Sequence, residues 1–290
     1  MTMTRFLQVG MAAAAAAAIT FGAQAADMPV YKAATPAVPP SLSWTGFYLG
    51  INAGGSIGTD TTRQTATFSS TALGVNGLLD SSGRYNPTGW VAGGQIGFNW
   101  QASAFVFGLE ADWQWSLQQD SRNSCTPAAT IAFFGAGANG FGYCLSGEQK
   151  ITNIGTARAR AGLDRNGTWW YVTGGLAWGT VKENDSFAGS ANTTIFPAVL
   201  QPGPLLPGAA SFSTTRMGWT VGAGVETMIA GGWSAKLEYL YVDLGSISNT
   251  LPIPINPAFG PAFTTGGVAI ATNTSRVTDN ILRFGLNYRF

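Results

Sequence analysis

Residues 104–115 read AFVFGLEADWQW, and their side chains alternate strictly between two kinds. Every second position holds an apolar residue: Phe105, Phe107, Leu109, Ala111, Trp113 and Trp115. The positions between them include two carboxylates, Glu110 and Asp112. A β-strand turns successive side chains to opposite faces of its sheet. The stretch therefore predicts a strand with lipid on one face and a polar lumen on the other, as in a transmembrane β-barrel.

The same period of two recurs along the chain. The repeats cover residues 46–57, 88–100, 151–163, 168–180, 215–228, 232–244 and 277–290. Each is long enough for the roughly 9 to 11 residues that a tilted strand needs to cross the hydrocarbon. Together with residues 104–115, they predict eight membrane-crossing strands.

The connections between these strands alternate between short and long. The short ones are 101–103, 164–167 and 229–231, and the second of them contains Asn166-Gly167, a strong hairpin signal. The long ones are 58–87, 116–150, 181–214 and 245–276, each of about 30 residues rich in Ser, Thr, Asn, Gly and Pro. Outer-membrane barrels have short periplasmic turns and long extracellular loops. The sequence thus predicts an all-β, eight-stranded antiparallel up-and-down barrel. A ninth or tenth strand inside the first or fourth long connection stays open.

Composition favours this fold over a soluble one. Only 10% of the residues are charged, whereas soluble globular proteins carry about 25%. A periplasmic β-sandwich or a lipocalin-like barrel also alternates, but it needs a more charged surface. Nine of the ten tryptophans lie within three residues of a predicted strand end, where an indole suits the headgroup level. These are Trp44, Trp90, Trp100, Trp113, Trp115, Trp169, Trp170, Trp178 and Trp233.

The N-terminus predicts export. Residues 1–25 combine the positive Arg5, an apolar stretch and a small-residue cleavage site, so we expect cleavage between Ala25 and Ala26. An uncleaved anchor is the alternative, but the run of alanines is only weakly apolar. We expect residues 26–45 to form a Pro/Ala-rich periplasmic tether and residues 46–290 to form the barrel. No later stretch is apolar enough for a transmembrane helix, and we expect the protein in the Gram-negative outer membrane.

The absence of histidine excludes several chemistries. Ser/His/Asp triads, Cys/His dyads, histidine-bound zinc and an axial haem histidine all need an imidazole. Removal of Arg5 with the signal peptide leaves 14 basic and 14 acidic residues, so no basic field exists for nucleic acid. We therefore expect no enzyme activity, no catalytic residue, no metal, no cofactor and no nucleic-acid partner. A hydrolase or acyltransferase barrel and a haem ligand set of Tyr or Met are alternatives that no spacing supports.

The second long connection holds the only two cysteines, Cys125 and Cys144. In the oxidising envelope we expect a disulfide, which closes a loop of about 20 residues and contributes about 3 kcal/mol in the chain-entropy model. Between them, residues 135–140 match GxGxxG. A dinucleotide site would need a strand before this motif and a helix after it, so we expect a plain loop.

Many charged residues fall on the inward face of the predicted strands. They are Glu110, Asp112, Arg158, Arg160, Arg216, Glu226, Lys236, Glu238, Arg283 and Arg289. The interior of an eight-stranded barrel is about filled by side chains. We therefore expect these charges to pair into a plug, with a narrow diffusion porin for small solutes as the alternative.

Several segments resemble one known family. They read ADMPVYK (26–32), WTGFYLGINAGG (44–55), YVTGGLAWG (171–179), GWTVGAGVE (218–226), WSAKLEYLY (233–241) and RFGLNYRF (283–290). These motifs are similar to those of the small outer-membrane immunogenic proteins of alpha-proteobacteria. The resemblance implies a porin-like surface barrel, linked in some members to envelope integrity or host interaction, and no catalytic residue. Tyr288 and Phe290 are similar to the terminal aromatic signal that the barrel-assembly machinery reads.

These observations define the expected partners. They are outer-membrane lipid and lipopolysaccharide, the barrel-assembly machinery, and either peptidoglycan or a host surface.

Overall fold

The structure, a computed structural model, describes residues 43–70, 75–126, 141–191, 207–253 and 267–290. The predicted signal peptide, its cleavage site, most of the tether and the GxGxxG stretch lie outside these residues. In the described part of the chain, no helix is long and apolar enough to cross a membrane.

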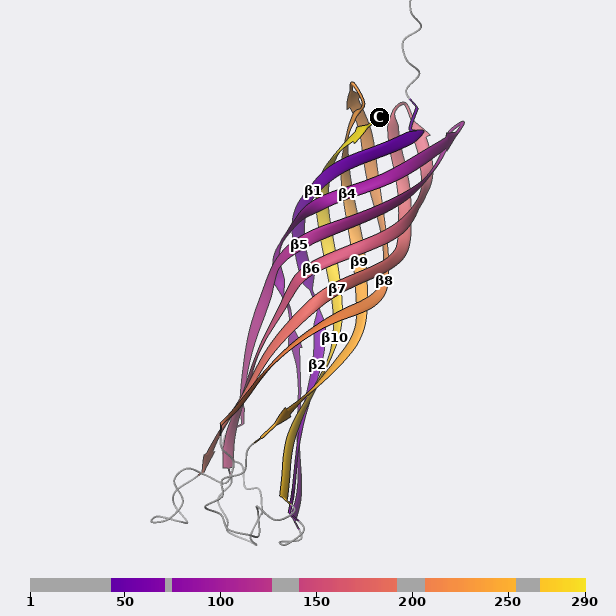
Figure 1. Cartoon of the computed structure of the whole chain (residues 1–290). Helices are drawn as coiled ribbons and strands as arrows, with labels where there is room; N and C mark the ends of the chain where they lie inside the picture. The colour runs from indigo at the N-terminus through magenta and orange to yellow at the C-terminus, as the bar shows by residue number, and fades with distance from the viewer. Residues whose placement is uncertain (1–42, 71–74, 127–140, 192–206, 254–266) are drawn as a thin grey trace, which may run out of the picture. The chain divides into compact units, whose positions relative to one another are not determined.

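Ten antiparallel strands make up the described chain (Figure 1). They are β1 (Gly46–Gly58), β2 (Asp60–Ser70), β3 (Val75–Tyr85), β4 (Thr88–Ala102), β5 (Phe105–Thr126), β6 (Phe141–Arg165), β7 (Thr168–Ala191), β8 (Gly208–Ala230), β9 (Trp233–Pro252) and β10 (Gly267–Arg289). They pair in the order β1-β4-β5-β6-β7-β8-β9-β10, and β1 also pairs with β10. The sheet therefore closes on itself, and the prediction of an all-β antiparallel barrel is confirmed.

Alternation places apolar side chains outside the ring and polar ones inside. On β1, Ile51 is 67% exposed while the neighbouring Asn52 is 4% exposed. The same contrast holds on β5 between Leu109 and Glu110, and on β10 between Leu282 and Arg283. Lipid solvates the exposed apolar side chains, which together form a belt around the ring. We call the part of the barrel that carries them the belt, and it is the membrane-spanning part.

Tight turns join the strands at the end of the barrel where β1 begins and β10 ends (Figure 1). Asn166 and Gly167 both have positive φ, 54° and 80°, as the two central residues of a type I′ turn require. Gly231 and Gly232, at 57° and 85°, adopt the same region between β8 and β9. The Asn-Gly hairpin signal in the sequence is therefore a turn of the predicted kind.

The described parts of the four long connections are almost entirely strand, which corrects the prediction of loops for these residues. The first contains β2 and β3, so the described residues form ten strands, of which β1 and β4 to β10 close the ring and β2 and β3 are the two further strands that the sequence left open. The other three connections are shorter than predicted because their flanking strands continue far beyond the belt, as β7 does to Ala191. The physical reason is that these segments still alternate: Val181 and Glu183 are buried while Lys182 between them is exposed. Their outward faces are polar instead of apolar, which hides a strand from a search for lipid-facing residues.

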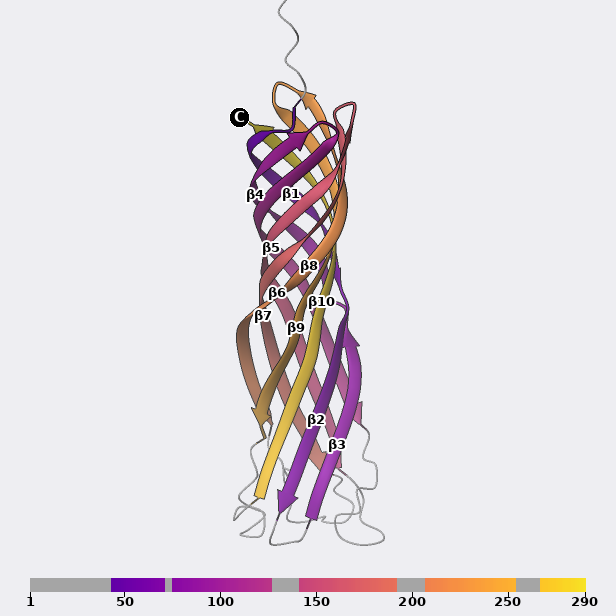
Figure 2. The ribbon, with the colours of Figure 1, turned by 90° about the vertical axis from the view of Figure 1, so that its right-hand side faces the viewer.

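Beyond the belt, the pairing divides the strands into two groups, which we call the extension. The β8–β9 ladder ends at the pair Trp219 and Asp243, and the β4–β5 ladder at the pair Thr88 and Gln119. From there, β5 to β8 continue as one sheet and β9, β10, β2 and β3 as another (Figure 2). The extension therefore consists of two antiparallel sheets that rise from one barrel.

Two of the predicted interface tryptophans lie inside the barrel. Trp44 and Trp169 are 1% and 0% exposed, and their ring centroids are 5.6 Å apart. The Trp44 indole donates a hydrogen bond to Asp164 at 3.0 Å. Trp169 lies on the inward side of β7, two residues before the inward Tyr171. Closeness to a strand end does not decide which face a side chain occupies, so the expectation for these two residues was wrong.

Candidate functional site in the barrel lumen

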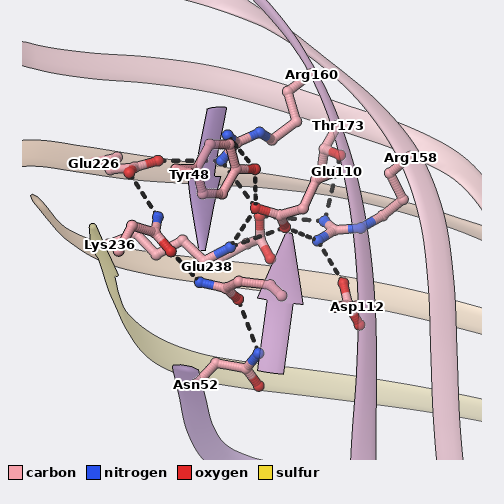
Figure 3. Close-up of polar contacts among 12 residues, drawn as sticks. Tyr48, Asn52, Glu110, Asp112, Arg158, Arg160, Thr173, Glu226, Lys236 and Glu238 are labelled. Carbon is pink, nitrogen blue, oxygen red and sulfur yellow. Dashed lines mark hydrogen bonds and ion pairs between the residues drawn. The ribbon is translucent and has the colours of Figure 1, made fainter. Parts of the chain in front are cut away.

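The lumen of the belt contains a cluster of buried charges centred on Glu110 of β5 (Figure 3). Arg158 of β6 donates to Glu110 at 2.5 Å, and Lys236 of β9 donates to it at 2.8 Å. Arg160 reaches the same carboxylate at 3.2 Å, and Arg283 reaches it at 3.5 Å. Four cations from three strands thus converge on one acid.

Three further carboxylates complete the cluster. Asp112 pairs with Arg158 at 2.9 Å and with Arg283 at 3.0 Å. Glu238 accepts from Arg283 at 2.5 Å, and Glu226 accepts from Arg160 at 3.1 Å.

The cluster is therefore electrically neutral. We call it the charge layer, and it comprises Glu110, Asp112, Glu226, Glu238, Arg158, Arg160, Lys236 and Arg283. None of these side chains is more than 2% exposed. Charges withdrawn from water this completely are tolerated only when they are paired and hydrogen-bonded.

Neutral side chains hydrogen-bond several further atoms of the layer, whereas Arg160 Nε and Arg283 Nη1 have no hydrogen-bond partner among the described residues. The Tyr48 hydroxyl donates to Glu110 at 2.6 Å and accepts from Arg160 at 2.7 Å. The Tyr171 hydroxyl donates to Glu238 at 2.8 Å. The Arg160 guanidinium also lies over the rings of Tyr48, Tyr171 and Trp169, at 4.6 to 5.1 Å from their centroids. Cation–π contacts of this kind add to the stability of a buried arginine.

Two apolar layers enclose the charge layer. Toward the turns lies the aromatic layer of Trp44, Val106, Trp169 and Tyr171, against which Met228 packs. Toward the extension lies a second layer, which we call the aliphatic layer. Its buried members are Val91, Ile151, Ile154, Ala177, Val181, Leu240, Val242, Leu244, Ile247, Val277 and Ile281. Buried charged, aromatic and aliphatic side chains thus follow one another along the lumen.

Arg216 and Arg289 were expected in the cluster, and the structure places them elsewhere. Arg216 lies beside Gly179 in the β7–β8 ladder, near the extension, and Arg289 lies beside Tyr48 at the turn end. In the described part of the chain, neither guanidinium forms an ion pair with a member of the charge layer. Two side chains can both point into the lumen and still lie at different levels along the barrel axis.

The inward tyrosines and aliphatic residues are the part of the site that the sequence reading overlooked. Tyr48 and Tyr171 occupy inward positions of β1 and β7, so the period of two could have found them. Leu240 and Val242 follow Lys236 and Glu238 at the same period along β9. An inward face that changes from charged to aliphatic along one strand was the available signal for the aliphatic layer.

The remaining predicted residues lie at opposite ends of the molecule. The structure joins Cys125 and Cys144 in a disulfide, and the two face each other in the β5–β6 ladder of the extension instead of within a loop. At the turn end, Phe290 is 78% exposed and its ring lies 5.2 Å from that of Tyr288. The described residues contain no group of three or more acids or cysteines arranged to hold a metal ion.

Comparison with known proteins gives consistent relatives. Residues 12–290 match the family described as "Outer membrane protein beta-barrel domain". The chain is 32% identical over 284 residues to the 31 kDa outer-membrane immunogenic protein of Brucella melitensis biotype 1, covering 96% of this chain and 98% of that protein. It is 31% identical over 211 residues to the 22 kDa outer membrane protein of Rhizobium leguminosarum bv. viciae, covering 72% and 68%. Among solved structures, the outer membrane protease OmpT from Escherichia coli aligns with a TM-score of 0.40 and 10% identity, covering 86% and 98%.

Proposed function

Because the chain belongs to the outer membrane protein β-barrel domain family, we propose that it is a non-enzymatic structural barrel of the envelope whose lumen is closed by its own side chains. Its relatives carry outer-membrane names, and the resemblance noted in the sequence and the outer-membrane location are both confirmed.

The observation that carries the proposal is the neutral and fully buried charge layer. A pore for solutes needs a continuous path of water, and water would leave at least some of these charged side chains accessible. Instead each carboxylate contacts at least one cation, and the side chains are at most 2% exposed. The aromatic and aliphatic layers lie on either side of this cluster and add further side chains to the lumen. The chemistry therefore favours stabilisation of a closed barrel over transport.

A narrow diffusion porin is the second candidate, because charged residues face the lumen. Swelling of liposomes separates the two. Vesicles with the folded protein should swell in iso-osmotic glycerol or arabinose at the rate of protein-free vesicles. Faster swelling that scales with the amount of folded protein would favour the porin and contradict the plug.

The extension provides a second part of the proposed role, as a surface presented to the environment. The 31 kDa and 25 kDa relatives from Brucella are named outer-membrane immunogenic proteins, which supports exposure of this chain at the cell surface. A peptide tag placed after Ser70, at the end of β2, should be labelled by antibody on intact cells. A tag placed at the Asn166-Gly167 turn should be labelled only after the outer membrane is opened.

An envelope role predicts a phenotype that does not depend on a substrate. A strain without the protein should become more sensitive to detergent, and the intact chain should restore resistance. A deletion strain with unchanged sensitivity to detergents and to chelators would contradict the structural role.

A further inference from the structure

A small hollow lies between the two sheets of the extension. Asp185 of β7 lines it from one sheet, and Gln64 of β2 and Asn273 of β10 line it from the other. The rest of its lining is apolar or hydroxyl-bearing: Leu145, Ser146, Ser186, Leu251, Ala271 and Thr272. Figure 2 shows β10 and β2 side by side. The hollow has a volume of about 10 Å³, which is about the least that a single water molecule needs and is enough for one metal ion.

Two amide oxygens at the hollow lack a hydrogen-bond donor. They are Gln64 Oε1 and Asn273 Oδ1, and neither has a partner among the described residues. Both side chains are only 6% exposed, so bulk water has little access to them. The Asn273 amide nitrogen donates to Asp185 at 3.4 Å, which places the Asn273 oxygen close to the same carboxylate. A buried acceptor without a donor is rare in native proteins and indicates a bound water molecule or ion.

A second carboxylate lies beside the hollow. Glu183 precedes Asp185 by two residues on the inward face of β7, about 7 Å along the strand. Gln149 of β6 donates to Glu183 at 3.1 Å, and Ser275 of β10 donates to it at 2.8 Å. Asn249 of β9 donates to the other oxygen of this carboxylate. These donors are neutral and come from both sheets, so they fix the position of Glu183 without removing its negative charge.

Arg122 of β5 also points between the sheets. Its guanidinium lies against Gly83 of β3, and Arg122 is not among the residues that line the hollow. Whatever Arg122 contacts, the amide oxygens of Gln64 and Asn273 have no donor in the described part of the chain. These oxygens call for a ligand that accepts electron pairs, which a cation does.

The kind of oxygen decides which cation fits. Carboxylate and amide oxygens are ligands for hard cations, whereas zinc favours nitrogen and sulfur. Magnesium demands near-octahedral geometry and keeps several water molecules, for which a hollow of this size has no room. Calcium accepts irregular sets of protein oxygens, and sites with few carboxylates bind it with dissociation constants of about 0.1 to 1 mM.

We propose that Asp185, Asn273 and Gln64 bind a calcium ion that joins the two sheets of the extension. The β8–β9 and β4–β5 ladders both end near the belt, so the ion would link sheets that these ladders no longer hold together. All three residues fall in segments that the sequence predicted as loops, and oxygen ligands need no histidine. The site lies beyond the belt and is independent of whether the lumen conducts.

The test measures calcium binding by the refolded mature chain in zwitterionic detergent micelles, after metal has been removed with EDTA and the EDTA washed out. Terbium ions take oxygen ligands as calcium does and luminesce when a nearby aromatic ring is excited. Tyr85 supplies such a ring, because its hydroxyl and Asp185 Oδ1 both lie beside Gly147. Calcium is then added to displace the terbium, and magnesium is added in a parallel titration.

Three variants are compared with the native protein. Asp185→Asn removes the carboxylate at the hollow. Gln64→Met removes the amide oxygen but keeps the length and the charge of the side chain. The control is Glu148→Gln, which removes a carboxylate from the outward face of the same sheet as Asp185, where the side chain is more than a third exposed. Unchanged heat-modifiable migration in gels establishes that each variant is folded.

The native protein should give a saturable terbium signal that calcium displaces with a dissociation constant of about 0.1 to 1 mM. Both site variants should bind calcium about tenfold more weakly or worse, since the loss of even an outer-shell partner costs about 10- to 100-fold, and the control should match the native protein. A native protein without a signal that calcium displaces would show that the hollow holds water only, and would overturn the proposal. Native affinity in either site variant, an equal loss in the control, or displacement by magnesium as readily as by calcium would also contradict it.

Discussion

At the scale of single residues, Glu110 is the acid on which the charge layer depends, since four cations contact it. Glu110→Gln removes its charge with little change of shape and leaves an excess of buried positive charge. Breaking a buried ion pair from one side costs about 3 to 5 kcal/mol. We expect a loss of that order in the free energy of unfolding, measured by urea titration in lipid vesicles with tryptophan fluorescence.

Glu148→Gln is the matched control for this substitution. Glu148 pairs with Lys150 at 2.9 Å, but both side chains are more than a third exposed. Exposed pairs contribute about 0 to 1 kcal/mol, so this variant should unfold close to the native midpoint. Equal losses in the two variants would show that Glu110 is not the centre of a buried network.

Phe290 carries a second prediction at this scale. Its ring is exposed beside Tyr288, and its backbone NH donates to the Phe47 carbonyl at 3.1 Å. Deleting Phe290 removes one terminal hydrogen bond and the expected assembly signal. Surface levels in cells should fall and periplasmic aggregate should rise, as measured by fractionation and blotting. A deletion that reaches the membrane at native levels would assign Phe290 to the aromatic girdle alone.

The sequence predicted the inward orientation of these charged residues better than their contacts. The period of two along each strand was enough to place Glu110 and Arg158 on the inward face. Alternation along one strand does not tell how far along the barrel axis a side chain lies, because that level depends on the register between strands. For that reason Arg216 and Arg289 were grouped with charges that they do not contact.

At the scale of elements, the disulfide belongs to the β5–β6 ladder of the extension. Cys125 and Cys144 face each other across the ladder, and the crosslink should form quantitatively in the exported protein. Alkylation without reduction should leave the mass unchanged, and alkylation after reduction should add two adducts. An adduct on unreduced, folded protein from the membrane would contradict the crosslink.

The pH dependence of the extension provides another prediction. Asp185 lies on β7 beyond the belt, where burial, followed by the neighbouring Glu183, raises its pKa from 3.8 to about 6. A carboxyl whose pKa is higher in the folded chain than in the unfolded chain destabilises the fold once it ionises. The stability should therefore fall as pH rises from about 4 to about 6, by up to about 3 kcal/mol for a shift of this size.

Asp185→Asn isolates this effect, because the amide cannot titrate. Relative to the native protein, the variant should gain stability between pH 4 and pH 7, measured as the difference in urea midpoints at the two values. Other groups titrate in both proteins and cancel in this difference. A difference that stays constant with pH would show that Asp185 ionises as freely in the folded chain as in the unfolded one.

The sequence predicted the strands of the belt but not the strands of the extension. In the belt, large apolar residues alternate with polar ones, which reports the strand directly. In the extension, residues such as Thr61 and Arg63 of β2 meet water on the outward face, so the contrast between faces is weak. The Ser- and Thr-rich composition that indicated loops is equally compatible with a water-facing strand, since threonine favours β-structure.

At the scale of the whole molecule, the low charge content has a structural explanation. One face of the belt contacts lipid, and much of the remaining charge is paired inside the lumen. An antiparallel sheet that closes on itself leaves no edge inside the bilayer, which is the condition for a β-structure to cross it. Closure of the sheet and closure of the lumen are separate properties, and only closure of the lumen is a proposal.

Single-channel recording in a planar bilayer tests the closed lumen most directly. Refolded residues 26–290, with β-structure in the same lipid established by circular dichroism, should give no stepwise conductance at either polarity in 1 M KCl. The proposed reason is that the charge layer, together with the aromatic and aliphatic layers, closes the lumen to ions. Stepwise conductance from the native protein that scales with the amount inserted would contradict the account and favour a narrow porin.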